Sequence, residues 1–320
     1  MSNKRERYIV EKLNPNFGYF YRVKKTLISK NTKFQKIELL ETPEFGNVLL
    51  LDNVTQVGEK NEFLYHEPMV HPALCSHPFP ENILIIGAGD GGILREVLKH
   101  NTVKNAVMVE LDGEVIEFSK KYLAHVNNNC FRDKRVKVIV GDGRGYLENT
   151  KDKFDVVIMD MTDPFGPSIM LYTKEFFQYV KKAFKDKNGI LTMHTESPVS
   201  RPNIFNSIIK TLESMFVNVN IFYLYIQMYA TLWSIGVCSD AIDTSKLKQD
   251  RISRILKERK IGKLNAYSGL MHESMQSEFP FISAIRKQRA PVLTDKKHEF
   301  SEKVDCNLYS RLDIVELKNK

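Results

Sequence analysis

From residue 82 onward, short apolar runs alternate with segments of helical periodicity, and this alternation limits the possible folds more than any other feature. The apolar runs occupy residues 82–86, 106–110, 136–140, 154–160 and 189–194, and the helical segments occupy 93–99, 113–124, 174–185 and 203–216. Strands that alternate with helices form βαβ units, whose strands run parallel. Two later runs, 219–227 and 233–238, are close enough to form an antiparallel hairpin at one edge. We therefore predict an α/β domain with a mainly parallel sheet.

Residues 1–75 follow a different pattern. Strand-like runs at 19–23, 34–40 and 47–52 are separated by turn-forming residues and leave no room for helices between them. We predict a small antiparallel β domain over residues 1–75, followed by a catalytic domain over 76–320. Residues 62–70 have a helical pattern, and we expect this helix to begin or bend near Pro68.

Composition narrows the class of protein. With 42% hydrophobic and 27% charged residues, the chain of 320 residues is typical of a soluble globular protein, without a membrane-spanning run or a signal segment. Its four cysteines lack the C-x-x-C spacing of zinc sites and favour a reducing cytoplasm. The net charge of +8 comes from lysines and arginines mixed with acids, which favours a solvated surface over a nucleic-acid site.

A glycine-rich segment follows the first apolar run of the predicted α/β domain. It reads Gly87-Ala88-Gly89-Asp90-Gly91-Gly92 and fits the pattern G-x-G-x-x-G, in which glycines allow a tight turn and a close approach to a ligand. Glu110, at the end of the next predicted strand, can accept hydrogen bonds from both hydroxyls of a ribose. These features predict a nucleoside site, against the alternative of a tight turn beside an unrelated strand-end acid.

The acids at the strand ends narrow the choice of ligand. Asp90 repels the pyrophosphate of a dinucleotide and attracts an ammonium group, which favours a nucleoside with a cationic tail. Asp142, followed by Gly143, is placed to accept from an adenine amino group or to form a simple turn. Asp160 and Asp163 follow a buried strand and can bind a cation, take a proton or hold a metal. An all-oxygen Mg²⁺ site stays open here.

Taken together, these motifs resemble those of the polyamine aminopropyltransferases, the spermidine and spermine synthase family. The resemblance covers most of the chain. It rests on motifs in the family's order at residues 46–56 with 62–67, 87–92, 110–112, 141–143 and 160–167. One such motif is weak evidence, whereas the ordered set is highly specific.

The resemblance implies a Rossmann-like methyltransferase-type domain after the β domain, and a homodimer or homotetramer. It implies transfer of the aminopropyl group of decarboxylated S-adenosylmethionine to a di- or polyamine, releasing methylthioadenosine, with no cofactor and no metal. The catalytic residues by motif position are Asp160, Asp163 and Tyr65, with Asp160 as the acid–base residue. The donor-binding residues are Gln56, Gly87, Gly89, Asp90, Gly91, Glu110, Asp142 and Gly143. The acceptor-binding residues are Tyr65, His66, Asp163, His194, Glu196, Tyr229 and Trp233.

The acceptor is less well defined. Residues 227–233 depart from the Pro-Thr-Tyr-Pro-Ser-Gly-like run of many spermidine synthases, so putrescine, spermidine and other amines stay open, as does the product. His194 and Glu196 can equally be a satisfied buried pair, and Trp233 a core residue. The loop after Asp163 is either a moving lid or a static connection.

Two rival functions stay open. One is an S-adenosylmethionine-dependent N-methyltransferase of a small amine, and the other is a catalytically inactive polyamine-binding protein. Asp90 disfavours the methyltransferase, because the ordinary donor carries a carboxylate that this side chain repels.

Overall fold

The computed structural model describes residues 6–300 and 315–317, and the chain divides into two compact units. Among the described residues, the first unit contains 6–62, 226–231 and 315–317, and the second contains the rest. This division places residues 63–75 in the second unit, whereas we expected the first domain to reach residue 75.

The first unit consists of two antiparallel sheets. Its strands are β1 (Glu6–Asn14), β2 (Phe17–Val23), β3 (Lys25–Asn31), β4 (Lys36–Thr42), β5 (Gly46–Leu51), β6 (Val54–Gly58) and β14 (Val315–Leu317). One sheet has the order β14-β1-β2 and the other β3-β4-β5-β6. Asp52 and Asn53, with φ values of 48° and 66°, make the tight turn between β5 and β6. The small antiparallel sheet domain is confirmed.

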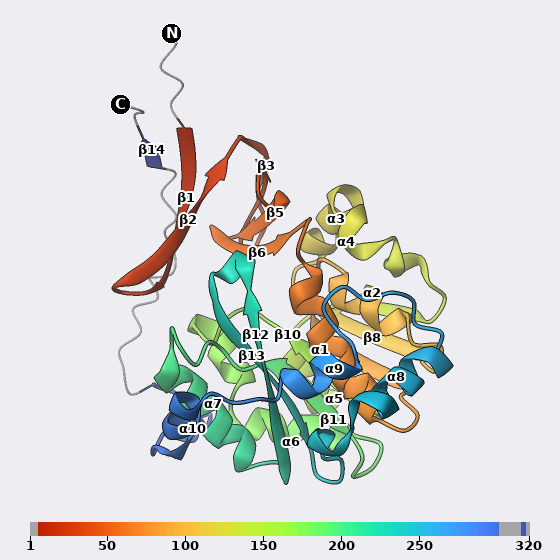
Figure 1. Ribbon diagram of the computed structural model, residues 1–320. Helices are drawn as coiled ribbons and strands as arrows, with labels where there is room; N and C mark the ends of the chain where they lie inside the picture. Colours follow the sequence, from red (N-terminus) through yellow and green to blue (C-terminus); the bar gives the residue numbers. More distant parts are fainter. Residues whose placement is uncertain (1–5, 301–314, 318–320) are drawn as a thin grey trace. The chain divides into compact units, whose positions relative to one another are not determined.

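The second unit is built on a seven-stranded sheet (Figure 1). Its strands are β7 (Asn82–Gly87), β8 (Asn105–Glu110), β9 (Val136–Val140), β10 (Val156–Asp160), β11 (Ile190–His194), β12 (Asn218–Ile226) and β13 (Thr231–Ser239). The order is β12-β13-β11-β10-β7-β8-β9. The neighbouring strands β9, β8, β7, β10 and β11 pair in parallel. At the other side of β11, strand β13 pairs with it antiparallel. The predicted Rossmann-like sheet with an antiparallel edge is therefore confirmed.

The order of the strands creates a switch point between β7 and β10. From β7 the chain adds β8 and β9 on one side, and it then returns to add β10 and β11 on the other side. The carboxyl ends of β7 and β10 diverge into separate loops there, which is where ligands bind in open α/β sheets. Gly87, the last residue of β7, is the register partner of Asp160, the last residue of β10.

Helices and short 3₁₀ turns connect these strands. The helices are α1 (Phe63–Ser76), α2 (Gly92–Leu98), α3 (Gly113–Tyr122), α4 (Ala124–Asn127), α5 (Gly143–Asn149), α6 (Lys174–Ala183), α7 (Pro202–Glu213), α8 (Gln249–Glu258), α9 (Gly269–Ser274) and α10 (Pro280–Lys287). The 3₁₀ turns are η1 (Cys130–Arg132), η2 (Gly166–Leu171), η3 (Gln227–Tyr229) and η4 (Thr244–Lys246). Side-chain caps start several helices, as where Asp112 accepts from the Glu114 N–H at α3.

Helix α1 begins at Phe63 and continues through Pro68 and Pro72. The expectation that it begins near Pro68 is wrong. Each proline removes one backbone donor, but the helix is buried from His66 to Ser76 and packs against β10, β11 and α2. Tertiary packing therefore outweighs the local cost of the prolines.

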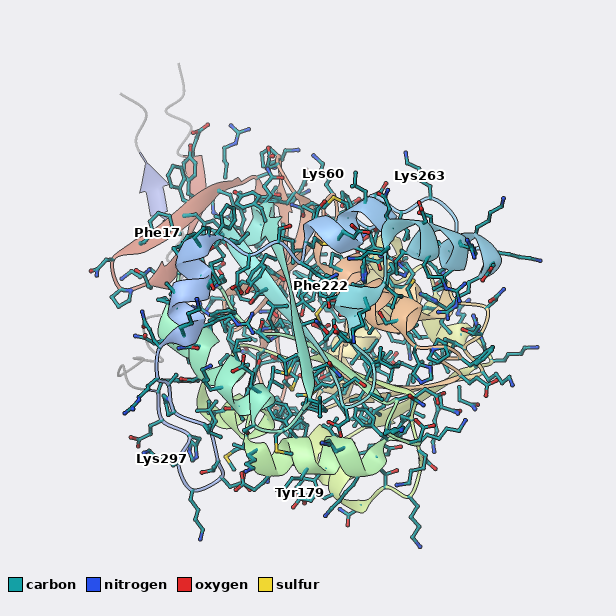
Figure 2. The ribbon with its side chains drawn as sticks, turned by 60° about the horizontal axis from the view of Figure 1, so that its bottom comes forward. Phe17, Lys60, Tyr179, Phe222, Lys263 and Lys297 are labelled. Atoms are coloured by element: carbon teal, nitrogen blue, oxygen red, sulfur yellow. The ribbon has the colours of Figure 1, made fainter. Side chains whose placement is uncertain are left out.

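Side chains fill the space between sheet and helices, while lysines such as Lys263 and Lys297 are exposed and project outward (Figure 2). Phe222 of β12 is fully buried. Within the described residues, the structure contains no helix that is both long and apolar enough to span a membrane.

Candidate active site

The switch point joins the glycine-rich loop to Asp160. Gly87 has a φ of 84°, and a Cβ added to it would collide with the backbone carbonyl oxygen of Asp160. The next residue, Ala88, donates its N–H to the same oxygen at 3.2 Å. Because only glycine combines this φ with this close approach, the sequence at Gly87 determines how near the loop lies to the end of β10.

Asp90 lies in this loop and faces the start of two helices. Its Oδ1 accepts a hydrogen bond of 2.6 Å from the N–H of Gly92, the first residue of α2, and its Oδ2 lies 3.6 Å from His66 Nε2. Burial opposes ionisation of Asp90, but the charge and hydrogen bond of His66 and the Gly92 N–H outweigh it and lower the pKa. Asp90 is therefore held as a carboxylate.

Glu110 ends β8 beside the same loop. The backbone N–H of Asp112 donates to its Oε1 at 2.9 Å. A Cβ on Gly89 would come within 3.1 Å of the other oxygen, so the small residue leaves that oxygen accessible from the loop. Burial raises the pKa of Glu110 to about 7, and the charges of neighbouring acids add to the effect.

Asp160 ends β10 and is linked to helix α1. The hydroxyl of Tyr65 donates to Asp160 Oδ1 at 2.7 Å. Burial, followed by the charge of Asp90, raises the pKa of Asp160 to about 6, against the opposing effects of His66 and Tyr65. A carboxylate with such a pKa is ionised at neutral pH and is a better base than an exposed aspartate.

The strand ends thus gather three carboxyl groups, from Asp90, Glu110 and Asp160. The charge of Asp90 raises the pKa of both Glu110 and Asp160, and the charge of Asp160 adds to the rise at Glu110. Such an arrangement favours a ligand that brings positive charge, since a cation relieves the repulsion. The sequence-based grouping of these acids is therefore reproduced by the fold.

Asp142 has a structural task of its own. Its carboxylate accepts from the N–H groups of Arg144 and Gly145 and caps α5. Gly143 is buried, and a Cβ there would meet the Ile86 side chain of β7 at 2.5 Å. Asp142 therefore has the structural role that the turn alternative predicted. Its contact with adenine stays a prediction.

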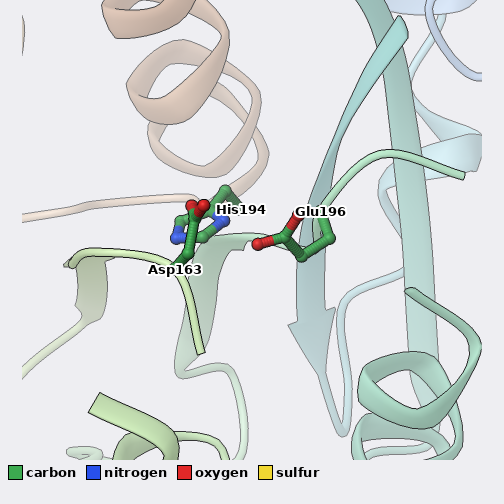
Figure 3. A group of neighbouring side chains, drawn as sticks. All are labelled: Asp163, His194 and Glu196. Atoms are coloured by element: carbon green, nitrogen blue, oxygen red, sulfur yellow. The ribbon is translucent and has the colours of Figure 1, made fainter. Parts of the chain in front are cut away.

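A second group of side chains lies beyond β10 and β11. It contains Asp163, His194 and Glu196, each of which offers one ligand atom within 4.8 Å of the others (Figure 3). His194 is 2% exposed and Glu196 is fully buried. Figure 3 shows the Glu196 carboxyl group directed toward the other two side chains. The structure therefore brings these three predicted acceptor residues together.

Arg201, which the sequence analysis missed, completes this group. Its Nη1 lies 2.6 Å from Asp163 Oδ2 and 2.9 Å from Glu196 Oε2. Burial opposes ionisation of Asp163, but the charge of Arg201 outweighs it and lowers the pKa. Burial raises the pKa of Glu196 to about 8 despite Arg201. The sequence signal was only an arginine before Pro202, at the start of a predicted helix.

The ring of His194 is fixed on several sides. Its Nε2 lies 2.9 Å from the Tyr172 hydroxyl and 3.0 Å from the Met161 carbonyl oxygen, which can only accept. We therefore assign the proton to Nε2, which leaves the buried Nδ1 as an acceptor with no hydrogen-bond partner. Burial lowers the pKa of His194, and its ring stacks on Trp233 with the centroids 5.6 Å apart. Trp233 is buried, as the core alternative predicted.

Asp163, His194 and Glu196 could alternatively bind a divalent metal, since the spacing of their potential ligand atoms suits a metal ion. Arg201, however, already brings a positive charge to both carboxylates. A dication would lie beside this guanidinium and repel it, so the donor set fits a metal poorly.

Two predicted site residues belong to the first unit. There the Tyr229 hydroxyl donates to the Gln56 backbone oxygen at 3.0 Å, and the Gln56 side chain donates to the Val54 carbonyl oxygen at 3.1 Å. Their roles toward the donor and the acceptor stay predictions.

Comparisons with known proteins agree on one family. Residues 62–249 match the spermine/spermidine synthase domain, and residues 8–59 match the spermidine synthase tetramerisation domain. A polyamine aminopropyltransferase of Nitrosomonas europaea is 34% identical, with 92% of this chain and 90% of the relative covered. One from Bacillus cytotoxicus is 39% identical, with 78% of this chain and 90% of the relative covered.

Solved structures give the same result for the fold. A spermidine synthase in complex with the transition-state analogue AdoDATO superposes with a TM-score of 0.82 and 30% identity, covering 89% of this chain and 97% of the other. The spermidine synthase of Thermotoga maritima superposes with a TM-score of 0.80 over the same shares, also at 30% identity.

Proposed function

The chain belongs to the spermine/spermidine synthase family and is a polyamine aminopropyltransferase, and we propose which of its residues carry out the transfer. The enzyme moves the aminopropyl group of decarboxylated S-adenosylmethionine to an amine and releases methylthioadenosine. The amine attacks the carbon next to the sulfonium, and the sulfur leaves as a neutral thioether. No acid is needed at the leaving group, so the site supplies alignment and removal of a proton.

Asp160 is the base of this proposal. An acceptor amine is protonated at neutral pH, since an alkylammonium has a pKa of about 10.4. Only the neutral amine has a lone pair for the attack, and the Asp160 carboxylate can orient the amine and take its proton. Tyr65 holds one oxygen of this carboxylate, which leaves the other for the substrate.

The donor interacts with the glycine-rich loop and the neighbouring acids. The single observation that carries the proposal is that Asp90 is held as a carboxylate in this loop, because it attracts the ammonium end of the decarboxylated donor. The ordinary donor has a carboxylate at that end, which Asp90 repels. Glu110 accepts from the ribose hydroxyls, and Asp142 contacts the rest of the nucleoside.

The acceptor interacts with Asp163, His194 and Glu196, together with Tyr65 and His66. These groups offer carboxylates and an imidazole nitrogen to ammonium groups. Trp233 supports the group by stacking on His194. The acceptor is a primary di- or polyamine, with putrescine and spermidine as the first candidates.

The chain forms a homo-oligomer, for which the match of residues 8–59 to a tetramerisation domain is the support. We favour a homotetramer over a homodimer. Sedimentation of the purified protein distinguishes the two. We also expect activity to persist after treatment with a chelator, since no step assigned here uses a metal. A cytoplasmic location stays a prediction.

The test is a product assay with both donors. Incubation with decarboxylated S-adenosylmethionine and an amine should yield methylthioadenosine, whereas ordinary S-adenosylmethionine should yield little S-adenosylhomocysteine. Predominant S-adenosylhomocysteine would support the methyltransferase instead, and donor binding without any product would support an inactive binding protein. Offering putrescine, cadaverine, agmatine, norspermidine and spermidine together, with spermine and thermospermine resolved, then identifies the acceptor.

A further inference from the structure

Arg201 has an unusual position for a cation in a site that receives cations. One of its nitrogens, Nη1, contacts both Asp163, at 2.6 Å, and Glu196, at 2.9 Å. The guanidinium carbon also lies 5.3 Å from the centre of the Phe165 ring, in the loop after β10. These are the carboxylates that an ammonium group of the acceptor would be expected to use.

Backbone hydrogen bonds and burial of the side chain fix the position of Arg201. Its N–H donates to the Ser197 carbonyl oxygen at 3.0 Å, and its carbonyl oxygen accepts from the N–H of Phe205 at 3.0 Å, so the residue starts helix α7. Its side chain is only 7% exposed. A guanidinium this far from water needs the two carboxylates, and the α7 N-terminus adds positive potential next to them.

The balance of charge in this group follows from its members. Asp163 is negative and Arg201 is positive, while burial favours the neutral forms of His194, Tyr172 and Glu196. The group therefore has little net negative charge with which to attract a second ammonium. It still offers a hydrogen-bond acceptor, because His194 Nδ1 is buried without a hydrogen-bond partner, whereas Glu196 shares a hydrogen bond with Asp163.

We propose that Arg201 is a specificity-determining residue of the acceptor site: it acts as an internal counter-ion of Asp163 and donates a hydrogen bond to Glu196, so a second ammonium group of the acceptor binds there only in competition with it. This inference rests on the proposed aminopropyl transfer. Its consequence is that the second charge of a diamine contributes less to acceptor selection than two acids alone would allow. The buried acceptor at His194 Nδ1 then favours an N–H-bearing group whose own charge is not essential.

The test compares two acceptors of equal carbon-chain length, putrescine with two charges and n-butylamine with one. The ratio of their kcat/KM values isolates the contribution of the second ammonium. In Arg201→Gln this ratio should rise by about tenfold or more, the scale of one charge-assisted hydrogen bond. In Arg201→Lys, which keeps the positive charge, it should stay within about threefold of the wild type.

Removing a buried arginine leaves two acids unpaired, so Arg201→Gln can fail to fold. The double variant Arg201→Gln/Glu196→Gln removes one of those acids and keeps Asp163, and the same rise in the ratio is expected there. An unchanged or smaller ratio in a folded variant would overturn the inference. So would Zn²⁺ binding to the wild type that Glu196→Gln abolishes, since the carboxylates would then serve a metal. If the wild type releases no methylthioadenosine with any amine, the proposed function itself is wrong.

Discussion

The Tyr65 hydroxyl donates a hydrogen bond of 2.7 Å to Oδ1 of Asp160, and this contact joins the start of α1 to the end of β10. It uses one carboxylate oxygen of Asp160 and stabilises the ionised form. Burial and the charge of Asp90 act in the opposite direction and raise the Asp160 pKa to about 6. Neighbouring elements thus have opposing effects on the pKa of Asp160, the proposed acid–base residue.

The first prediction concerns the pH profile. If Asp160 is the base, as proposed, kcat/KM should rise with pH as its carboxyl group loses its proton near pH 6. In Tyr65→Phe the hydrogen bond that favours the carboxylate is lost, so the acidic limb should shift to higher pH. Profiles of both proteins with saturating donor measure this. A limb that stays in place in Tyr65→Phe would show that Tyr65 does not act through Asp160.

A second prediction separates chemistry from binding. Asp160→Asn keeps the shape of the side chain but cannot take a proton, so kcat should fall by about 100-fold or more. The substitution leaves the proposed donor contacts at Glu110 and the glycine-rich loop unchanged, so the donor dissociation constant should stay within about tenfold. Single-turnover rates and calorimetric titration of the donor provide the two numbers. Full turnover in this variant would refute the role of Asp160.

The third prediction addresses the choice of donor. Asp90→Asn retains an oxygen for the N–H of Gly92, the first residue of α2, but removes the charge. We expect the decarboxylated donor to bind about tenfold more weakly and the ordinary donor to be excluded less well. Competition between the two donors, followed by methylthioadenosine release, reports the change. Equal discrimination in the variant and the wild type would contradict the assigned role.

Much of this site follows from local patterns in the sequence. The apolar run before Asp160 forms a buried strand, and the glycines from Gly87 onward form the loop, because both depend on residues adjacent in the chain. Glu110 falls at the end of β8 for the same reason. Parallel strands then bring their carboxyl ends to one edge, so the sequence could predict that these acids meet.

The missed features depend on contacts between distant segments. Arg201 and Asp163 are 38 residues apart, and their ion pair requires α7 and the loop after β10 to meet at one point. The helical position of Pro68 likewise depends on the burial of α1, which local propensity does not contain. Periodicity and motif spacing describe neighbours in sequence, so tertiary packing of this kind lies beyond them.

A fourth prediction concerns a buried ion-pair network behind the site. Glu96 Oε2 lies 2.9 Å from His71 Nε2 and 2.7 Å from Lys99 Nζ. Burial opposes its ionisation, yet these partners and Arg95 hold the pKa of Glu96 far below its ordinary value. Its stabilisation is therefore present above about pH 4.5, the ordinary pKa, and is lost as the pH falls below that value.

Replacing Glu96 with Gln should therefore lower the free energy of unfolding at pH 7 by about 3 kcal/mol, because the partners stay buried without their counter-charge. The loss should shrink as the pH falls below the ordinary pKa of a glutamate. Denaturant unfolding at several pH values measures both effects. The control is Glu117→Gln, whose pair with Lys120 is exposed and should cost less than about 0.5 kcal/mol. Similar losses in the two variants would contradict the network.

The last prediction tests the switch point. Alanine at Gly87 would have to adopt a φ of 84° and would press its methyl group against the Asp160 carbonyl oxygen. The left-handed conformation alone costs about 1–2 kcal/mol, and relief of the clash must separate the ends of β7 and β10. We expect Gly87→Ala to lose at least that much stability and to weaken donor binding. Gly262→Ala is the matched control, since a Cβ there meets nothing within 4 Å. If Gly87→Ala were as stable and as active as Gly262→Ala, the close approach of the loop to Asp160 would not be essential to the site.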